Sequence, residues 1–198
     1  EIHNDLVYSG NKHIMFASLS EEFAMNSITC TAPSKTFNLA GMQSSNIIIP
    51  NPKFMEKYRR ILEKNNIGGQ NPLSIVSLEA AYNEGEEWLE QLLKYLEANI
   101  EFIHSYLAEH LPKAKMIKPQ ATYLGWIDLR AYETDGEKLQ ELIAYKGKVA
   151  LDGGTWFGEG GAGFMRLNFA CPRKLLEEGL NRLCRAVNEA YCTAASES

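Results

Sequence analysis

The chain has 198 residues, of which 20 are basic and 25 are acidic, giving a formal net charge of −5, and this length can bury one sizeable core or two small ones. With no basic patch, nucleic acid is a poor candidate partner, and no apolar run reaches the ~20 residues of a membrane span. The four cysteines lack the paired spacing of a zinc site or a disulfide framework, so the sequence predicts no metal and favours a cytoplasmic protein.

The N-terminal part is predicted to form short strands and helices. Ser18, followed three residues later by Glu21, indicates a helix start. The apolar run at 28–30 predicts the end of a buried strand that turns at Pro33. The β-branched run at 47–49 predicts a second buried strand.

Three helices are predicted over the middle of the chain. Asn51-Pro52 and Asn71-Pro72 each place a cap residue before a proline at the first helical position. The third helix runs from about Glu86 to His110. Its apolar residues recur at alternating steps of three and four, which predicts one continuous stripe: Leu89, Leu92, Leu96, Ile100, Ile103 and Leu107. A helix of this length can join two lobes.

A second compositional region follows Pro112. Three strands are predicted there, over 123–129, 149–151 and 164–170. An Asp-Gly turn leads into a helix at about 137–144, and a final helix begins at Pro172. The inward side of that final helix is predicted to carry Leu176, Leu180, Leu183 and Val187. The tail from Cys192 to Ser198 is expected to fray.

Lys35 stands among small hydroxyl residues, between a predicted strand and a glycine-ended apolar stretch. A solvated loop lysine is the ordinary interpretation. The full stretch from Thr31 to Gly41, however, resembles the cofactor-lysine segment of the class I/II aminotransferases, the fold-type I enzymes that use pyridoxal 5'-phosphate. It is most similar to their cystathionine β-lyase-like C–S lyase subgroup. The resemblance implies that Lys35 bonds the cofactor, and burial is expected to keep its amine partly neutral.

The first residues, Glu1 to Leu6, resemble the family's Asp-Glu-Ile-His segment without its aspartate. In the family, that aspartate pairs with the ring nitrogen of the cofactor. Ile2 would then end a parallel strand, and His3 would bond the cofactor's phenolic oxygen, with a purely structural histidine as the alternative. The 198 residues are therefore expected to be the C-terminal half of a longer enzyme and to be inactive alone.

The expected phosphate contacts differ from those of many family members. These members carry an arginine eight residues after the lysine and a serine three residues before it. This chain has Gln43 and Ala32 at those positions. The resemblance therefore leaves Ser34 and Thr31, together with groups outside the chain, to bind the cofactor phosphate.

Arg166 is the candidate for substrate binding. Its predicted strand is otherwise apolar, so the guanidinium is either paired or poised for an anion. The segment 165–173 resembles the family segment whose arginine holds the α-carboxylate of the amino-acid substrate. An internal ion pair is the alternative.

The G-x-G-x-x-G at 158–163 runs into a strand, so it is interpreted as a loop beside the substrate pocket, with Trp156 and Phe157 as its wall.

The resemblance implies an α/β fold: the C-terminal part of a large-domain mixed sheet at 1–84, an interdomain helix at 85–111 and a smaller α+β domain at 112–198. It also implies a homodimeric, pyridoxal-phosphate-dependent enzyme acting on amino acids. A C–S β-lyase that releases a thiol, pyruvate and ammonia is the preferred activity, and an aminotransferase is the alternative. A non-catalytic cofactor-binding sensor domain is an alternative of another class.

Overall fold

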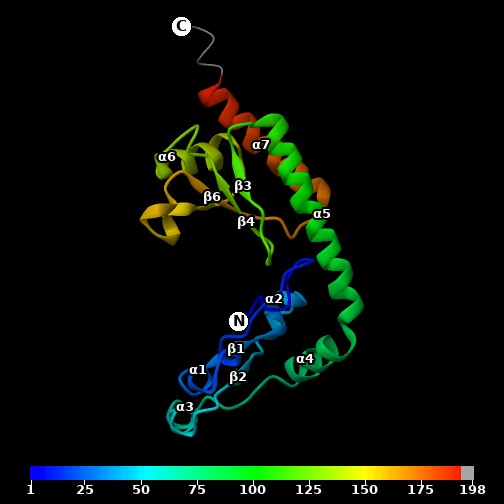
Figure 1. Cartoon of the computed structure of the whole chain (residues 1–198), viewed down its shortest axis with the longest axis vertical. Coiled ribbons are helices and arrows are strands. Elements are labelled where there is room, and N and C mark those ends of the chain that lie inside the picture. The colour runs from blue at the N-terminus through cyan, green and yellow to red at the C-terminus, as the bar shows by residue number, and fades with distance from the viewer. Residues whose placement is uncertain (193–198) are drawn as a thin grey trace. The chain divides into compact units, whose positions relative to one another are not determined.

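The structure is a computed structural model in which residues 1–192 are described. It divides into two compact units, residues 1–93 and 94–198, whose elements are labelled in Figure 1. The predicted domain limits at 84 and 111 remain a prediction. Most of the predicted frayed tail lies outside the described residues.

The first unit contains a two-stranded antiparallel sheet. Strand β1 (Thr29–Thr31) pairs with β2 (Asn46–Ile48). Both strands were expected at these places, but the prediction that they are buried is wrong, because Cys30 and Ile48 are exposed on this small sheet. Ile2 lies in a turn formed by residues 2–5 and not at the end of a strand.

The first short helix begins two residues later than predicted. Helix α1 spans Glu21–Met25, and its N-cap is Ser20, whose hydroxyl accepts a hydrogen bond from the Phe23 amide at 3.3 Å. Ser18 instead ends a 3-10 turn and donates its hydroxyl to the Met15 carbonyl at 2.7 Å. Because Ser18 and Ser20 are both suitable cap residues, the local sequence does not decide which one caps the helix.

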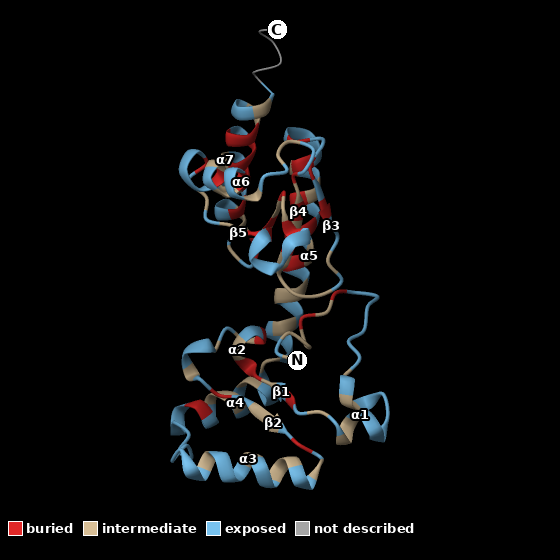
Figure 2. Ribbon diagram, turned by 90° about the vertical axis from the view of Figure 1, so that its left-hand side faces the viewer, coloured by how far each residue is buried: buried red, intermediate tan, exposed pale blue. Residues whose placement is uncertain are grey.

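Both predicted Asn-Pro helix starts are confirmed. The Asn51 side chain accepts from the Lys53 amide at 2.9 Å, and Asn71 accepts from the Leu73 amide at 3.0 Å. The remaining helices of this unit are α2 (Pro33–Thr36), the 3-10 helix η2 (Ala40–Met42), α3 (Pro52–Lys64) and α4 (Pro72–Glu84). Every residue of α3 is exposed or half-buried, as Figure 2 shows.

The predicted long helix is confirmed as α5 (Glu86–His110). Its buried residues begin at Leu96 and continue towards its C-terminal end: Leu96, Asn99, Ile100, Ile103 and Leu107. The final helix is α7 (Arg173–Tyr191), and all four residues predicted on its inward side are buried. Figure 1 shows the C-terminal half of α5 beside α7, on one side of the sheet of the second unit.

This sheet has four antiparallel strands in the order β3-β4-β6-β5. Their bounds are Lys115–Ile117 for β3, Leu124–Asp128 for β4, Phe164–Asn168 for β6 and Asp152–Gly153 for β5. Ile127 and Met165 are buried on one face, whereas Trp126 and Arg166 are half-buried on the other. The predicted strand at 149–151 is wrong: the Val149 amide donates to the Ile143 carbonyl at 3.2 Å, so this segment closes the preceding helix.

Helical segments connect β4 to β5 and β5 to β6. They are α6 (Gly136–Glu141), the π-helical turn η3 (Leu142–Lys146), and the 3-10 turns η4 (Gly154–Phe157) and η5 (Glu159–Gly161). As predicted, the glycine-rich stretch leads into strand β6. The mixture of helices and antiparallel strands confirms the α/β prediction. Among residues 1–192, no helix combines the length and apolarity that a bilayer crossing requires.

Candidate functional site

Lys35 lies on α2, a single helical turn that directly follows β1. The turn is closed by the Phe37 amide, which donates to the Pro33 carbonyl at 2.9 Å. Pro33 and Thr36 are buried, whereas Lys35 is exposed. The expected burial of Lys35 is therefore wrong for this chain, because α2 packs through its neighbours and leaves the lysine amine accessible.

Thr36, the residue after Lys35, ties α2 to the N-terminal turn. Its hydroxyl donates to Oδ2 of Asp5 at 2.9 Å, and the Asn4 amide donates to Oδ1 of the same carboxylate at 2.9 Å. The turn that carries half-buried His3 therefore lies against the turn that carries Lys35.

Thr31 and Ser34 lie on the same segment as Lys35. The Thr31 hydroxyl accepts from the Asn46 side chain at 3.3 Å. Burial and the nearby Asp5 charge raise the pKa of Tyr82, and a hydrogen bond with Thr31 opposes them. Half-buried Ser34 accepts the Leu39 amide with its carbonyl at 3.1 Å. The four residues predicted to bind the cofactor thus all belong to the first unit.

Aromatic packing fixes the end of α2. The Phe37 ring meets Tyr82 edge-on with centroids 5.7 Å apart, and it lies 5.9 Å from the ring of Trp88. Gly85 allows this approach, since a Cβ there would lie 2.5 Å from the Phe37 ring. Tyr82 and Gly85 help to hold the turn that carries Lys35, and the sequence analysis missed both. An isolated tyrosine or glycine in a helical segment carries no distinctive signal.

Arg166 lies in the second unit, on β6. Its Nε donates to Oδ2 of Asp152 at 2.9 Å, and Nη2 of the same guanidinium contacts the same oxygen. The side chains of Arg166 and Asp152 are 33% and 39% exposed. The internal ion pair that the sequence left as an alternative is therefore present. The Nη1 group lies outside these bonds, so the guanidinium retains N–H groups for a second anion.

Arg166 contacts one ring of an aromatic cluster. Its guanidinium carbon lies 4.6 Å from the centroid of the Phe157 ring, and Phe157 meets Trp126 edge-on at 5.6 Å. Trp126 in turn stacks on Phe164 at 5.5 Å. Trp156 is 63% exposed. Phe157 is thus placed beside Arg166, while the role of Trp156 and Phe157 in a substrate pocket remains a prediction.

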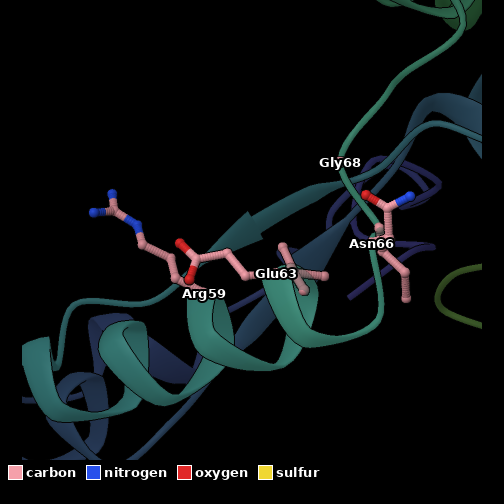
Figure 3. A pocket seen from close by; sticks show the side chains of 6 residues that line it. Arg59, Glu63, Asn66 and Gly68 are labelled. Carbon is pink, nitrogen blue, oxygen red and sulfur yellow. The ribbon is translucent and has the colours of Figure 1, made fainter.

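A pocket of about 370 Å³ lies at the C-terminal end of α3, away from the predicted residues. Arg59, Glu63, Asn66 and Gly68 are among its lining residues, as Figure 3 shows. It contains neither the predicted lysine nor any predicted cofactor contact, so it carries no part of the proposed chemistry.

Comparison with known proteins gives relatives over nearly the whole chain, although no protein-family model matches it. The chain is 47% identical to the cystathionine β-lyase PatB of Bacillus subtilis, over 95% of the chain and 49% of that protein. It superposes on cystalysin from Treponema denticola, whose structure contains pyridoxal 5'-phosphate, with a TM-score of 0.91 and 37% identity, over 96% of the chain and 48% of cystalysin. An aspartate aminotransferase of Pyrococcus horikoshii is 25% identical over 94% of the chain and 47% of that protein. The chain thus spans about half the length of these relatives.

Proposed function

Because the chain belongs to the family of pyridoxal-phosphate-dependent C–S lyases and aminotransferases and corresponds to its C-terminal half, we propose that the protein binds pyridoxal 5'-phosphate through Lys35. We further propose that it cleaves the C–S bond of amino acids such as cystathionine. The relative with 47% identity is named a cystathionine β-lyase, which favours the lyase over the aminotransferase.

The position of Lys35 is the observation that carries this proposal. Its amine is exposed on a turn that is itself fixed by a buried proline, a buried threonine and the Phe37 ring contacts. Forming a covalent bond with an aldehyde requires an amine that is accessible and held in place. A solvated loop lysine would not need such a fixed turn.

The surrounding residues fit the cofactor in their chemistry. Ser34 and Thr31 supply hydroxyl groups within four residues of Lys35, which suits a phosphate. His3 lies on the turn that Asp5 links to α2, and an imidazole nitrogen can hydrogen-bond a phenolic oxygen. We assign these three residues to cofactor binding and Lys35 to the covalent bond.

When bound, pyridoxal phosphate supplies an electron sink that stabilises negative charge at the substrate Cα. With the cofactor bound, the Lys35 amine would hold it until the substrate arrives and would then act as the base for the substrate Cα proton. In the lyase reaction the Cβ–S bond breaks, the thiol leaves, and water converts the remaining carbon skeleton to pyruvate and ammonia. In the aminotransferase alternative, the same Lys35 amine would carry the proton, no thiol would leave, and the amino group would be transferred instead.

We assign Arg166 to the substrate carboxylate. A guanidinium offers several N–H donors in one plane, so it can bind a carboxylate through Nη1 while Nε and Nη2 remain on Asp152. Asp152 would then orient the guanidinium, and the Phe157 ring at 4.6 Å would restrict its motion.

A homodimer in the cytoplasm is part of the proposal. Leu73, Ile75 and Val76 at the start of α4 are 67%, 43% and 64% exposed, and such apolar groups commonly mark surfaces that another protein segment covers. The four cysteines are free, as is usual in a reducing compartment. Analytical ultracentrifugation of the complete protein tests the dimer.

The activity is tested by incubating the complete protein with pyridoxal phosphate and L-cystathionine. A lyase releases homocysteine, pyruvate and ammonia in equal amounts without an added keto acid. An aminotransferase requires a keto acid and releases no thiol. A protein that binds the cofactor but gives neither reaction with a panel of amino acids would support the sensor alternative.

A further inference from the structure

We propose that Asp5 is a positioning residue for Lys35 and that it acts through Thr36. This inference rests on the proposed function, because it assigns Asp5 a role in the same site. Asp5 lies 30 positions before Lys35 in the sequence, and neither its type nor its spacing indicates this role.

The hydrogen bond between Thr36 and Asp5 joins two segments far apart in the sequence. The Thr36 side chain is 0% exposed, and its hydroxyl donates to Oδ2 of Asp5 at 2.9 Å. The other carboxylate oxygen accepts from the Asn4 amide at 2.9 Å. Each oxygen of Asp5 thus has its own donor, which fixes the plane of the carboxylate and the direction in which it holds Thr36.

Lys35 depends on this bond because α2 is a single turn of four residues. Such a turn has no flanking helical hydrogen bonds that could preserve its geometry if one anchor is lost. The turn is held at Thr36 by Asp5 and at Phe37 by the rings of Tyr82 and Trp88. Since the Lys35 side chain is exposed, its amine is positioned mainly through the backbone that these neighbours fix.

Loss of the Asp5 carboxylate would leave a buried threonine hydroxyl without its acceptor. The turn would then shift to bring that hydroxyl to another partner, and Lys35 would move with it. A catalytic amine must stay within about 0.5 Å of its productive position, so such a shift lowers the rate of its bond formation and proton transfer. Binding of the substrate carboxylate by Arg166 would not change.

The test compares Asp5→Ala, Thr36→Val and the double variant in the complete protein. Each single variant is expected to lower kcat about tenfold and to leave KM within about twofold. The rate at which the cofactor-free protein forms a borohydride-fixable bond with added pyridoxal phosphate is expected to fall by a similar factor. Because both residues act through one bond, the double variant is expected to lose no more than about twofold beyond either single variant.

Thr36→Ser keeps the hydroxyl and is expected to recover kcat to within about twofold of wild type. Asp5→Asn keeps an acceptor oxygen in a side chain of the same shape, so it tests the inference if Asp5→Ala does not fold; a loss of about threefold is expected. Asn51→Ala is the matched control. It removes the 2.8 Å hydrogen bond to the Met25 carbonyl and the side-chain cap of α3 in the same unit, and should lower the melting temperature while leaving the bond-forming rate unchanged.

Normal kcat and normal bond-forming rates in Thr36→Val and Asp5→Asn, with only a lowered melting temperature, would overturn the inference. So would a double variant whose losses multiply to about a hundredfold, because the two residues would then act separately. If wild-type protein forms no fixable bond at Lys35, the proposed function itself fails. That result is distinguishable because it appears before any variant is compared.

Discussion

Replacing Arg166 by alanine distinguishes a role in substrate binding from a structural role, because the two roles predict losses of different size in kcat/KM and in the free energy of unfolding. Removing a guanidinium that binds a carboxylate in a partly desolvated pocket costs about 2–5 kcal/mol of binding free energy. This corresponds to a fall in kcat/KM of roughly one and a half to three and a half powers of ten. If Arg166 is only structural, the expected effect is smaller and falls on stability. The ion pair with Asp152 is about one-third exposed, so it contributes ~0–1 kcal/mol to the free energy of unfolding. The contact with Phe157 adds roughly 0.5–1 kcal/mol.

The assay measures kcat/KM with L-cystathionine and the unfolding free energy on the same preparation of the complete protein. Arg166→Ala is expected to show the large kinetic loss with normal cofactor absorbance, and Arg166→Lys to recover only part of it, since an ammonium cannot supply the planar fork. Asp152→Asn is the matched control. It removes the charge of the ion pair but keeps an amide oxygen that can accept from the guanidinium and still orient it, so it should retain kcat/KM within about threefold. Kinetics of Arg166→Ala within threefold of wild type would remove Arg166 from the substrate site.

Other predictions concern stability and thiol reactivity. Phe169→Ala removes a ring that is 0% exposed and is expected to lower the unfolding free energy in urea by about 3–5 kcal/mol. Burial raises the pKa of Cys184 to about 12, so at pH 8 a thiol reagent should label exposed Cys192 and spare Cys184 until the protein unfolds. Because the unfolded thiol ionises near pH 9 and the native one does not, the contribution of Cys184 to stability should fall as the pH rises from about 9 towards 12. Gly85→Ala would place its Cβ 2.5 Å from the Phe37 ring and should lower the melting temperature measured by circular dichroism.

Features that depend on short spacings could be predicted from the sequence. The Asn51 cap needs only a neighbouring proline and an amide two residues away, and both lie within one turn. The strand that carries Arg166 was found because its side chains alternate between a buried and a half-buried face. The inward side of α7 followed from helical periodicity in the same way.

Features that depend on distant pairing could not be predicted. Asp152 lies opposite Arg166 in the register of β5 and β6, and a register between strands is not encoded in either strand alone. The hydrogen bond between Asp5 and Thr36 joins residues 31 positions apart, so no local sequence pattern predicts it. The burial predicted for Lys35 was wrong for a related reason: helix α2 buries Pro33 and Thr36 and not the lysine itself.

The central claim, that Lys35 bonds pyridoxal phosphate, is tested most directly by reducing the complete protein with borohydride in the presence of the cofactor. The modified peptide is then located by mass spectrometry after digestion. The expected result is loss of the yellow absorbance band and a cofactor-sized mass increase on the peptide that contains Lys35, with neither change in Lys35→Ala. A modified peptide without Lys35, or equal modification of Lys35→Ala, would contradict the claim.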